Sequence, residues 1–256
     1  MNAVRLLLPL LPLLFAACVV APAAIAQPQA VGRVEQAAGL AWAIPPGAAE
    51  RTLARGDSIF EGESIVTASD GELLIRMVDD AVIAVRANTR FTVSRYQFAS
   101  RERVKESTSL LSITRGALRT VTGLIGRQNP RGFQVGTSTA TIGVRGTDFE
   151  TVVVEDDTPE AAAGTYQRVT SGATVVTDLK SGQTLEVTAG QVAFAALNIA
   201  AAAQGLGLLN NVPAVFRPGR YDNLLQAAGD LLQQQLLKQV PGNLRQFMPN
   251  LPGLFR

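Results

Sequence analysis

The sequence predicts an all-β protein in which many short strands form a sandwich or a solenoid-like β-roll, followed by a C-terminal α-helical segment. Two observations lead to this prediction. Between residues 31 and 197, short apolar segments follow one another at spacings near ten residues, with glycine at most of the breaks. After residue 197 the turn signals give way to Ala, Leu, Gln and Asn at helical spacing.

The strand segments alternate with turns throughout the β region. Residues 72–78 end at the turn pair Asp79-Asp80, and residues 81–86 end at Ala87-Asn88. Residues 90–96 alternate polar and apolar side chains, which places Phe91 and Val93 on one face of a strand. Further strands are expected at 109–114, 116–121, 132–135, 148–154, 166–170, 173–178, 184–187 and 191–195, with breaks at glycines that include Gly116, Gly146 and Gly172.

The first 26 residues are predicted to be a secretory signal peptide. Arg5 precedes a short apolar run, and Ala24-Ile25-Ala26 gives the small-x-small pattern that signal peptidase reads. Cleavage there predicts a periplasmic protein that begins at Gln27 and has no transmembrane segment in the mature chain. The alternative is a lipobox at residues 15–18, in which Cys18 is lipidated and anchors the chain to a membrane.

The C-terminal extension, residues 197–256, is expected to contain one amphipathic helix at about 222–239. Asp222 is placed to cap its start, and Pro241-Gly242 is placed to end it. An apolar stripe lies opposite a polar face, and we expect it to dock on the β region rather than on a partner or a membrane surface. The stripe comprises Leu224, Leu225, Ala228, Leu231, Leu232 and Leu236.

Composition limits the chemistry that the chain can perform. It has no histidine and one cysteine, which excludes Ser-His-Asp catalysis, histidine-based zinc sites and cysteine clusters. Its carboxylates gather at turns, where Asp is expected, and none has the spacing of a calcium loop. We therefore expect no enzyme activity, no catalytic residue, no metal and no cofactor. The alternative is a carboxylate-dependent envelope hydrolase, which a cleft joining two acidic clusters would favour.

Charge is distributed unevenly along the chain. Residues 86–145 hold eleven basic and two acidic residues, a net charge of +9, between segments of net charge −5 and −6. Such a segment could bind an anionic glycan or lipopolysaccharide, or its strands could neutralise acidic neighbours. Residues 123–132 are expected to form an exposed loop, so Arg127 and Arg131 are candidate ligand-binding residues, together with Arg145. Nucleic acid is not an expected partner, because the chain lacks an aromatic-basic stacking platform.

Three motifs of the β region resemble those of the FecR domain, a periplasmic module named after an iron-citrate signalling regulator. Residues 53–62, LARGDSIFEG, are similar to the family's L-x-x-G-D-x-I-x-T-G, and residues 187–191, VTAGQ, match V-x-A-G-Q. Residues 133–149, FQVGTSTATIGVRGTDF, are similar to f-x-V-x-T-P-x-A-x-x-x-V-R-G-T-x-F. The positions that carry the motifs include Gly56, Asp57, Gly143, Val144, Arg145, Gly146, Thr147, Phe149 and Gly190.

The resemblance covers roughly residues 30–196 and implies a β-rich, non-enzymatic module of the envelope. Its implied role is binding, scaffolding or sensing, with an envelope protein or an anionic glycan as partner. Family regulators carry a sigma-factor-binding segment and a spanning helix before this domain, and here the predicted signal peptide stands in their place, so the anti-sigma function is not carried over. Arg145 and Asp148 are close enough to pair across a turn at Gly146; the alternative is a purely architectural strand crossover.

Overall fold

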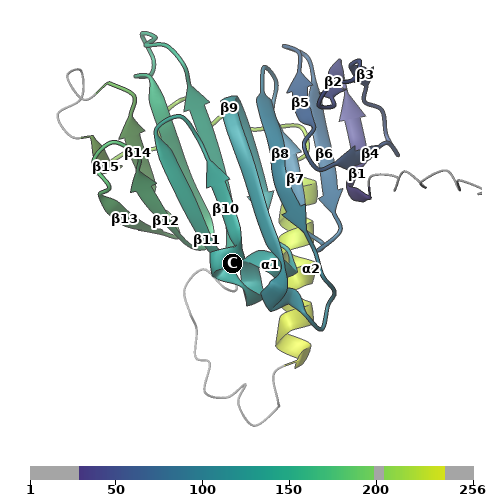
Figure 1. Ribbon diagram of the computed structural model, residues 1–256. Helices are drawn as coiled ribbons and strands as arrows, with labels where there is room; N and C mark the ends of the chain where they lie inside the picture. The colour runs from purple at the N-terminus through teal and green to yellow at the C-terminus, as the bar shows by residue number, and fades with distance from the viewer. Residues whose placement is uncertain (1–28, 199–204, 240–256) are drawn as a thin grey trace, which may run out of the picture.

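The computed structural model describes residues 29–198 and 205–239 (Figure 1). Strands make up 53% of the structure and helices 11%, so the protein is mostly β. One large mixed sheet is followed by a C-terminal helix, α2 (Asp222–Gln239), which confirms the predicted fold class. Within the described ranges, no helix combines the length and the apolar character needed to cross a membrane.

The described residues form fifteen strands and a few short helices. The strands are β1 (Ala30–Ala38), β2 (Ala41–Ile44), β3 (Arg51–Thr52), β4 (Ser58–Phe60), β5 (Ser64–Thr67), β6 (Glu72–Met77), β7 (Val82–Val85), β8 (Arg90–Gln97), β9 (Thr108–Val121), β10 (Phe133–Gly136), β11 (Ala140–Val154), β12 (Gly164–Asp178), β13 (Thr184–Thr188), β14 (Val192–Ala196) and β15 (Leu206–Leu209). The short helices are η1 (Val104–Glu106), α1 (Leu124–Gln128) and η2 (Pro130–Gly132).

Three long strands fold this sheet over into two layers, because each of them changes partners halfway along. The first half of β9 pairs with β8 and β10, and its second half pairs with β7 and β11. β11 and β12 pair with each other along both halves and change partners at their other edges, β11 from β10 to β9 and β12 from β14 to β13. Layer A comprises β2, β3, β5, β8, β10 and β13 with one half of each bent strand, and layer B comprises β1, β4, β6, β7, β14 and β15 with the other halves. The result is a solenoid-like roll.

Glycine allows the three bends. Gly116, Gly146 and Gly172 have φ angles of 83°, 56° and 82°, a region that other residues rarely adopt. At the last of these the chains also approach closely, since an ideal Cβ on Gly172 would lie 2.5 Å from the carbonyl oxygen of Gly146. The predicted strand breaks at these glycines are wrong. A bulge with positive φ bends a strand sharply without ending its pairing, so each strand continues on the other layer.

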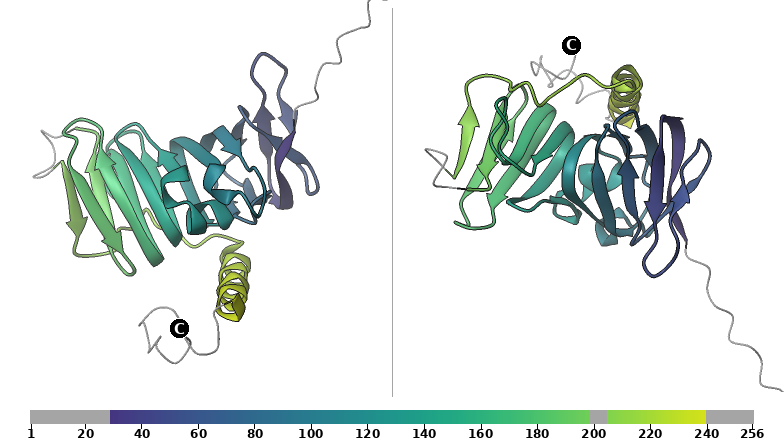
Figure 2. Two further views of the ribbon diagram at one scale, coloured as in Figure 1. Left: turned by 60° about the horizontal axis from the view of Figure 1, so that its bottom comes forward. Right: turned by 90° about the horizontal axis from the view of Figure 1, so that it is seen from above.

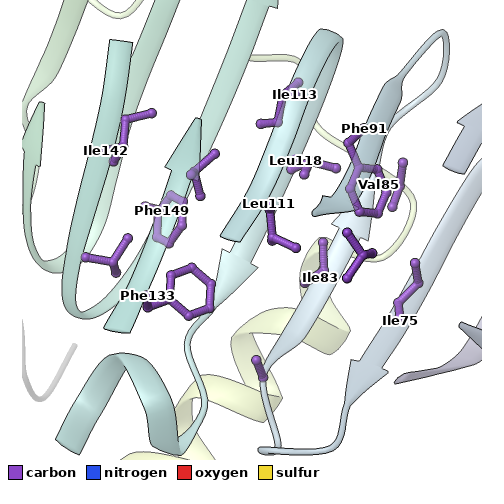
Figure 3. Packing of buried hydrophobic residues seen from close by; sticks show 14 of the residues in the cluster. Ile75, Ile83, Val85, Phe91, Leu111, Ile113, Leu118, Phe133, Ile142 and Phe149 are labelled. Carbon is purple, nitrogen blue, oxygen red and sulfur yellow. The ribbon is translucent and has the colours of Figure 1, made fainter. Parts of the chain in front are cut away.

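The core fills the space between the two layers (Figure 3). Phe91 and Val93 of β8 are both 1% exposed, as their period-two pattern predicts. Residues two apart in a strand share one face of the sheet, so both side chains point to the same side. That side faces the apolar side chains of layer B. The largest fully buried side chains of the cluster are Phe91, Phe133, Phe149, Ile59, Ile65, Leu73, Ile75, Ile83, Leu111, Leu118, Ile125 and Ile142.

The C-terminal part of the chain covers the outer face of layer B (Figure 2). Tyr221, Leu225 and Ala228 pack against apolar side chains of β6, β7 and β9, so α2 docks on the β region as predicted. The predicted stripe is wrong in part, because Leu224 and Leu231 are 46% and 60% exposed. The helix faces the sheet along the i, i+4, i+7 row that begins at Tyr221. The side chains of Leu232 and Leu236 lie outside the described residues.

Candidate binding site

The motif at residues 133–149 mainly builds the corner where β11 passes between layers. Phe149 is buried and meets Phe133 edge to face, with ring centroids 6.5 Å apart. The Thr147 hydroxyl donates to the Ala173 carbonyl at 2.8 Å, and the Thr147 amide donates to the Thr122 hydroxyl at 2.8 Å. Val144 is 1% exposed, and Gly143 lies within β11 between β10 and β12. These residues hold three strands together.

The other motif positions form turns. The Asp57 carboxylate accepts the Ala54 amide at 2.8 Å, and the Gly56 amide donates to the Val34 carbonyl at 2.8 Å. Gly190 has a φ of 84° at the turn between β13 and β14. The Asp57 carboxylate bonds within its own turn, and the Gly56 amide ties that turn to β1, so these positions serve the fold. Cys18, the candidate for lipidation, lies outside the described residues.

Arg145 and Asp148 are on different layers and do not pair, contrary to the expectation from their spacing. Asp148 instead accepts two hydrogen bonds from Arg119 of β9, at 3.1 and 2.8 Å. The bulge at Gly146 separates the two side chains, because the strand changes layers between them. Arg145 is exposed and has no carboxylate within ion-pair distance among the described residues.

The predicted exposed loop at residues 123–132 is wrong, because most of it is helical and two of the five residues of α1, Ile125 and Gly126, are buried. Ile125 is fully buried in the core between the layers. The segment is held by Asp79, whose carboxylate accepts the Ile125 amide at 3.0 Å and whose carbonyl accepts the Leu124 amide at 2.8 Å. Tyr96 donates its hydroxyl to the other carboxylate oxygen of Asp79 at 2.5 Å. A buried carboxyl group therefore closes this end of the roll.

Arg127 and Arg131 differ in accessibility. Arg127 is half-buried and donates from Nε to the Thr122 carbonyl at 2.8 Å. Burial lowers the pKa of the Arg127 guanidinium, and the charge of Asp79 partly offsets this. Arg131 is exposed on η2 and has no ion-pair partner among the residues that the structure describes.

The fold brings the three predicted arginines to one end of the roll. The backbone and side chain of Arg127 lie beside Gly146, next to Arg145, and both α1 and η2 pack against β11. We call this region the α1 end and define it by α1, η2 and the β11 corner. Figure 1 shows it at the lower edge of the sheet. Arg131 and Arg145 are the accessible cations of this set.

A second group of charged residues lies on the outer face of layer B, and no sequence motif predicted it. Glu150 stands between two arginines: it accepts Nε and Nη2 of Arg86 at 3.1 Å each, and Nη2 of Arg168 at 2.7 Å. Asp222 of α2 accepts Nη2 of Arg86 at 2.7 Å and lies 3.2 Å from Nη1 of Arg119. Three arginines and three carboxylates form this charged network, namely Arg86, Arg119, Arg168, Asp148, Glu150 and Asp222.

The charges of the network help to explain why the pKa of Asp222 is lowered. Partial burial by itself would raise the pKa of Asp222, but the Gly219 amide and the guanidinium groups of Arg86 and Arg119 outweigh it and hold the pKa below its usual value. The basic segment therefore neutralises its acidic neighbours at these positions. The sequence does contain a signal of this network: single charged residues, such as Arg119 and Arg168, stand in otherwise apolar or uncharged strand segments. The missing information was which strands lie side by side.

No group of three or more Asp, Glu or Cys residues within the described ranges could hold a metal ion. Two single carboxylates, Glu61 and Glu106, do lie on one cavity of about 520 Å³ near the end of β8, which Tyr96, Phe98 and Val78 also help to line. Glu61 already accepts the Tyr96 amide at 2.8 Å, so one of its oxygens serves the fold.

The bent two-layer roll, with structural motifs at its corners and charge on its outer surfaces, defines a β-rich domain. The FecR protein family matches residues 63–193, and the chain belongs to this family. A comparison with curated proteins finds no match. Two crystal structures of a "putative anti-sigma factor" from Parabacteroides distasonis are similar, each with 18% identity, a TM-score of 0.43, and coverage of 58% of this chain and 59% of that chain.

Proposed function

We propose that this FecR-family chain is an exported, non-catalytic binding module of the bacterial envelope, and that it recognises an anionic glycan or the phosphates of lipopolysaccharide. The α1 end supplies the cations. An exposed arginine that meets a phosphate or carboxylate with two parallel hydrogen bonds provides both charge and orientation.

One observation supports this proposal above the others: the contrast between paired and unpaired arginines. Arg86, Arg119 and Arg168 are matched to carboxylates on the outer face of layer B. Arg131 and Arg145 are exposed at one end of the roll and lack a carboxylate partner among the described residues. Unpaired surface cations that gather at one place attract an anionic partner, and their attraction weakens as salt rises.

The test is binding of lipopolysaccharide and of an acidic polysaccharide to the full chain and to Arg131→Ala/Arg145→Ala. Each lost charge-assisted contact is worth about 1.5–3 kcal/mol when desolvated, and less when exposed, so we expect affinity to fall by about tenfold or more. Arg127 is left intact, because it also donates to the Thr122 carbonyl and supports α1.

The matched control is Arg33→Ala/Arg55→Ala. Both residues are exposed arginines without an ion-pair partner among the described residues; Arg33 lies in β1 and Arg55 in the turn before β4, at the far edge of layer B. Replacing them changes the net charge of the chain by the same amount as Arg131→Ala/Arg145→Ala does. Binding that falls by the same factor in both double variants would point to net charge alone and contradict a site at the α1 end.

The cavity beside Glu61 and Glu106 keeps one alternative open, a carboxylate-dependent envelope hydrolase. Two carboxyl groups on one cavity are the minimum for glycoside hydrolysis. The distinguishing measurement is release of reducing ends from peptidoglycan or acidic polysaccharide by the full chain, Glu61→Gln and Glu106→Gln. Release of reducing ends by the parent chain that each substitution abolishes would establish the hydrolase. If the parent chain releases no reducing ends, the hydrolase alternative is contradicted and the binding module is retained.

A further inference from the structure

The segment that joins β15 to α2 runs across the outer face of layer B. We call residues 210–221 the C-terminal strap. Figure 2 shows it crossing from the edge strands to the start of α2. The described strap and the first residue of α2 contribute two principal anchors, Phe216 and Asp222, which are six residues apart.

The surface beneath the strap has a matching site for each anchor. Phe216 is buried against Tyr166, Phe194 and other apolar side chains of β11, β12 and β14. The guanidinium carbon of Arg168 lies 4.8 Å from the centre of the Phe216 ring, in cation–π contact. Asp222 occupies the other site, between Arg86 and Arg119.

Without the strap this surface would be a receptor for an acidic group. Arg86, Arg119 and Arg168 would then face only Asp148 and Glu150, leaving one positive charge in excess. With the strap in place, the side chains of Arg86 and Arg119 are only 10% and 11% exposed, so a covering segment without an acidic group would leave the excess charge poorly solvated. A carboxylate placed where Asp222 lies relieves this.

The strap fits this surface incompletely. Nη1 of Arg86 is buried and has no hydrogen-bond partner among the described residues. A cavity of about 280 Å³ lies beside it, bounded by Val215 and Pro218 of the strap and by Ala117 and Val152 of the sheet. A buried donor without an acceptor is unfavourable, so a segment that supplied an acceptor there would bind better than the strap does.

The strap is also held in a way that permits release. Its backbone–backbone hydrogen bonds, within the described part of the chain, connect strap residues to one another and to the start of α2. Among the described residues, its attachments to polar groups of the sheet are the Arg220 amide on Glu72, at 2.9 Å, and the contact of Phe216 with Arg168. The ion pairs of Asp222 follow directly at the start of α2. Lifting it therefore breaks side-chain contacts and leaves every strand pairing intact.

We propose that the outer face of layer B is a docking groove for an extended segment of a partner protein, and that the C-terminal strap occupies this groove until the partner arrives. The segment it accepts carries an aromatic side chain and, about six residues further on, a carboxylate. This site is separate from the α1 end, and the proposal does not depend on glycan binding.

The test uses a fluorescent synthetic peptide with the sequence of residues 212–231 and follows its anisotropy with the full chain. Phe216→Ala/Asp222→Asn in the protein weakens the strap, and we expect it to bind the peptide at least about tenfold more tightly than the parent chain does. A peptide carrying the same two substitutions should lose this binding. Asp230→Asn, an equal change of charge at an exposed position of α2, is the control and should bind as the parent does.

A second measurement covers the case in which the double variant does not fold. Hydrogen exchange of the parent chain should show the amides of residues 214–225 opening together, well before those of β9 and β11. Strap amides that exchange only with global unfolding would overturn the proposal, as would a folded double variant that binds the peptide no better than the parent. A dimer whose straps are exchanged between copies, seen as a doubled mass by sedimentation, would overturn the assignment to a partner.

Discussion

Glu150 lies in the outer face of layer B between an arginine of β12 and the Arg86 that follows β7, and both of its carboxylate oxygens are used. Its side chain is 1% exposed, and the side chains of Arg86 and Arg168 are 10% and 29% exposed. Cross-strand register produces this arrangement, because Glu150 is directly opposite Arg168 on one side and Arg119 on the other. The carboxylate therefore stabilises the fold by compensating charges that water reaches poorly.

Replacing Glu150 should destabilise the protein strongly. Glu150→Gln leaves Arg86 and Arg168 short of a negative charge, and breaking a buried pair in this way costs about 3–5 kcal/mol. Chemical denaturation measures the change in unfolding free energy. Glu155→Gln, at an exposed position at the end of β11, is the control and should cost within about 0.5 kcal/mol. Equal stability of the two variants would show that the network is not compensating buried charge.

Asp79 should give the protein a component of stability that decreases with rising pH. Burial raises the pKa of Asp79, although the hydrogen bonds from Tyr96, Ile125 and Ala81 oppose the rise and the charge of Asp80 adds to it. The folded state therefore keeps this proton to a higher pH than the unfolded state does. The stabilisation is complete below the ordinary Asp pKa of about 3.9 and is lost as pH rises through the folded pKa.

The measurement is the unfolding free energy of the parent and of Asp79→Asn from about pH 3 to pH 7. The difference, parent minus variant, should fall with rising pH, because only the parent loses a proton here. Asp80→Asn, which removes the neighbouring carboxylate that pairs with Arg101, should show a smaller fall, because Asp79 is kept and only the contribution of the Asp80 charge to its pKa is lost. A difference that rises with pH would mean that the hydrogen bonds to Asp79 outweigh its burial.

At the scale of elements, the bent strands determine the shape of the molecule. β9, β11 and β12 are 14, 15 and 15 residues long, and each contributes to both layers. A strand without a bend could not do this, since it would carry its pairing straight along one sheet. The position of α2 depends on these bends, because Leu74, Val82 and Val121 come together beneath it from three strands of layer B.

The corner at Gly172 should tolerate no side chain. Gly172→Ala adds a Cβ at positive φ and also places it 2.5 Å from the Gly146 carbonyl oxygen. Gly182→Ala is the matched control, because its φ is 72° and nothing lies within 4 Å of the added Cβ. The first variant should therefore be less stable than the second by about 1–3 kcal/mol, the usual cost of overpacking, in thermal or chemical denaturation. Equal losses of stability in the two variants would show that the positive φ angle, and not the close contact, accounts for the whole effect.

At the scale of the whole molecule, the outer face of layer B and the α1 end differ in what covers them. The outer face of layer B is covered by the strap and α2 over its charged network (Figure 2). The α1 end presents exposed cations at Arg131 and Arg145. Two different surfaces are thus available on one chain, and the proposals made for them can be tested separately.

Export is the prediction that concerns the whole chain. The pattern Ala24-Ile25-Ala26 after an apolar run predicts cleavage that leaves Gln27 first, and mass spectrometry of the protein from bacterial envelopes measures this. A lipid-modified Cys18 would establish the lipoprotein alternative. Recovery of the intact chain in the cytoplasm, with Met1 or its direct successor first, would contradict both.

The sequence by itself determined the features that are local or periodic. Alternation placed Phe91 and Val93 inside, and glycine and turn residues separated most strands. Helical spacing located α2 at residues 222–239, and the motifs at 53–62, 133–149 and 187–191 indicated the family. Each of these patterns depends on neighbours within about ten residues, so the order of residues contains it.

Only the tertiary structure decided which segments meet. Asp148 pairs with Arg119 instead of Arg145 because the strand changes layers between positions 145 and 148. The segment at 123–132 became a buried helical turn because a carboxylate 46 residues away in sequence, Asp79, accepts its amide. The charged network joins residues as far apart as Arg86 and Asp222. Such contacts depend on strand register and on the choice between two faces of a sheet, and a pattern that repeats every two residues fits many registers equally well.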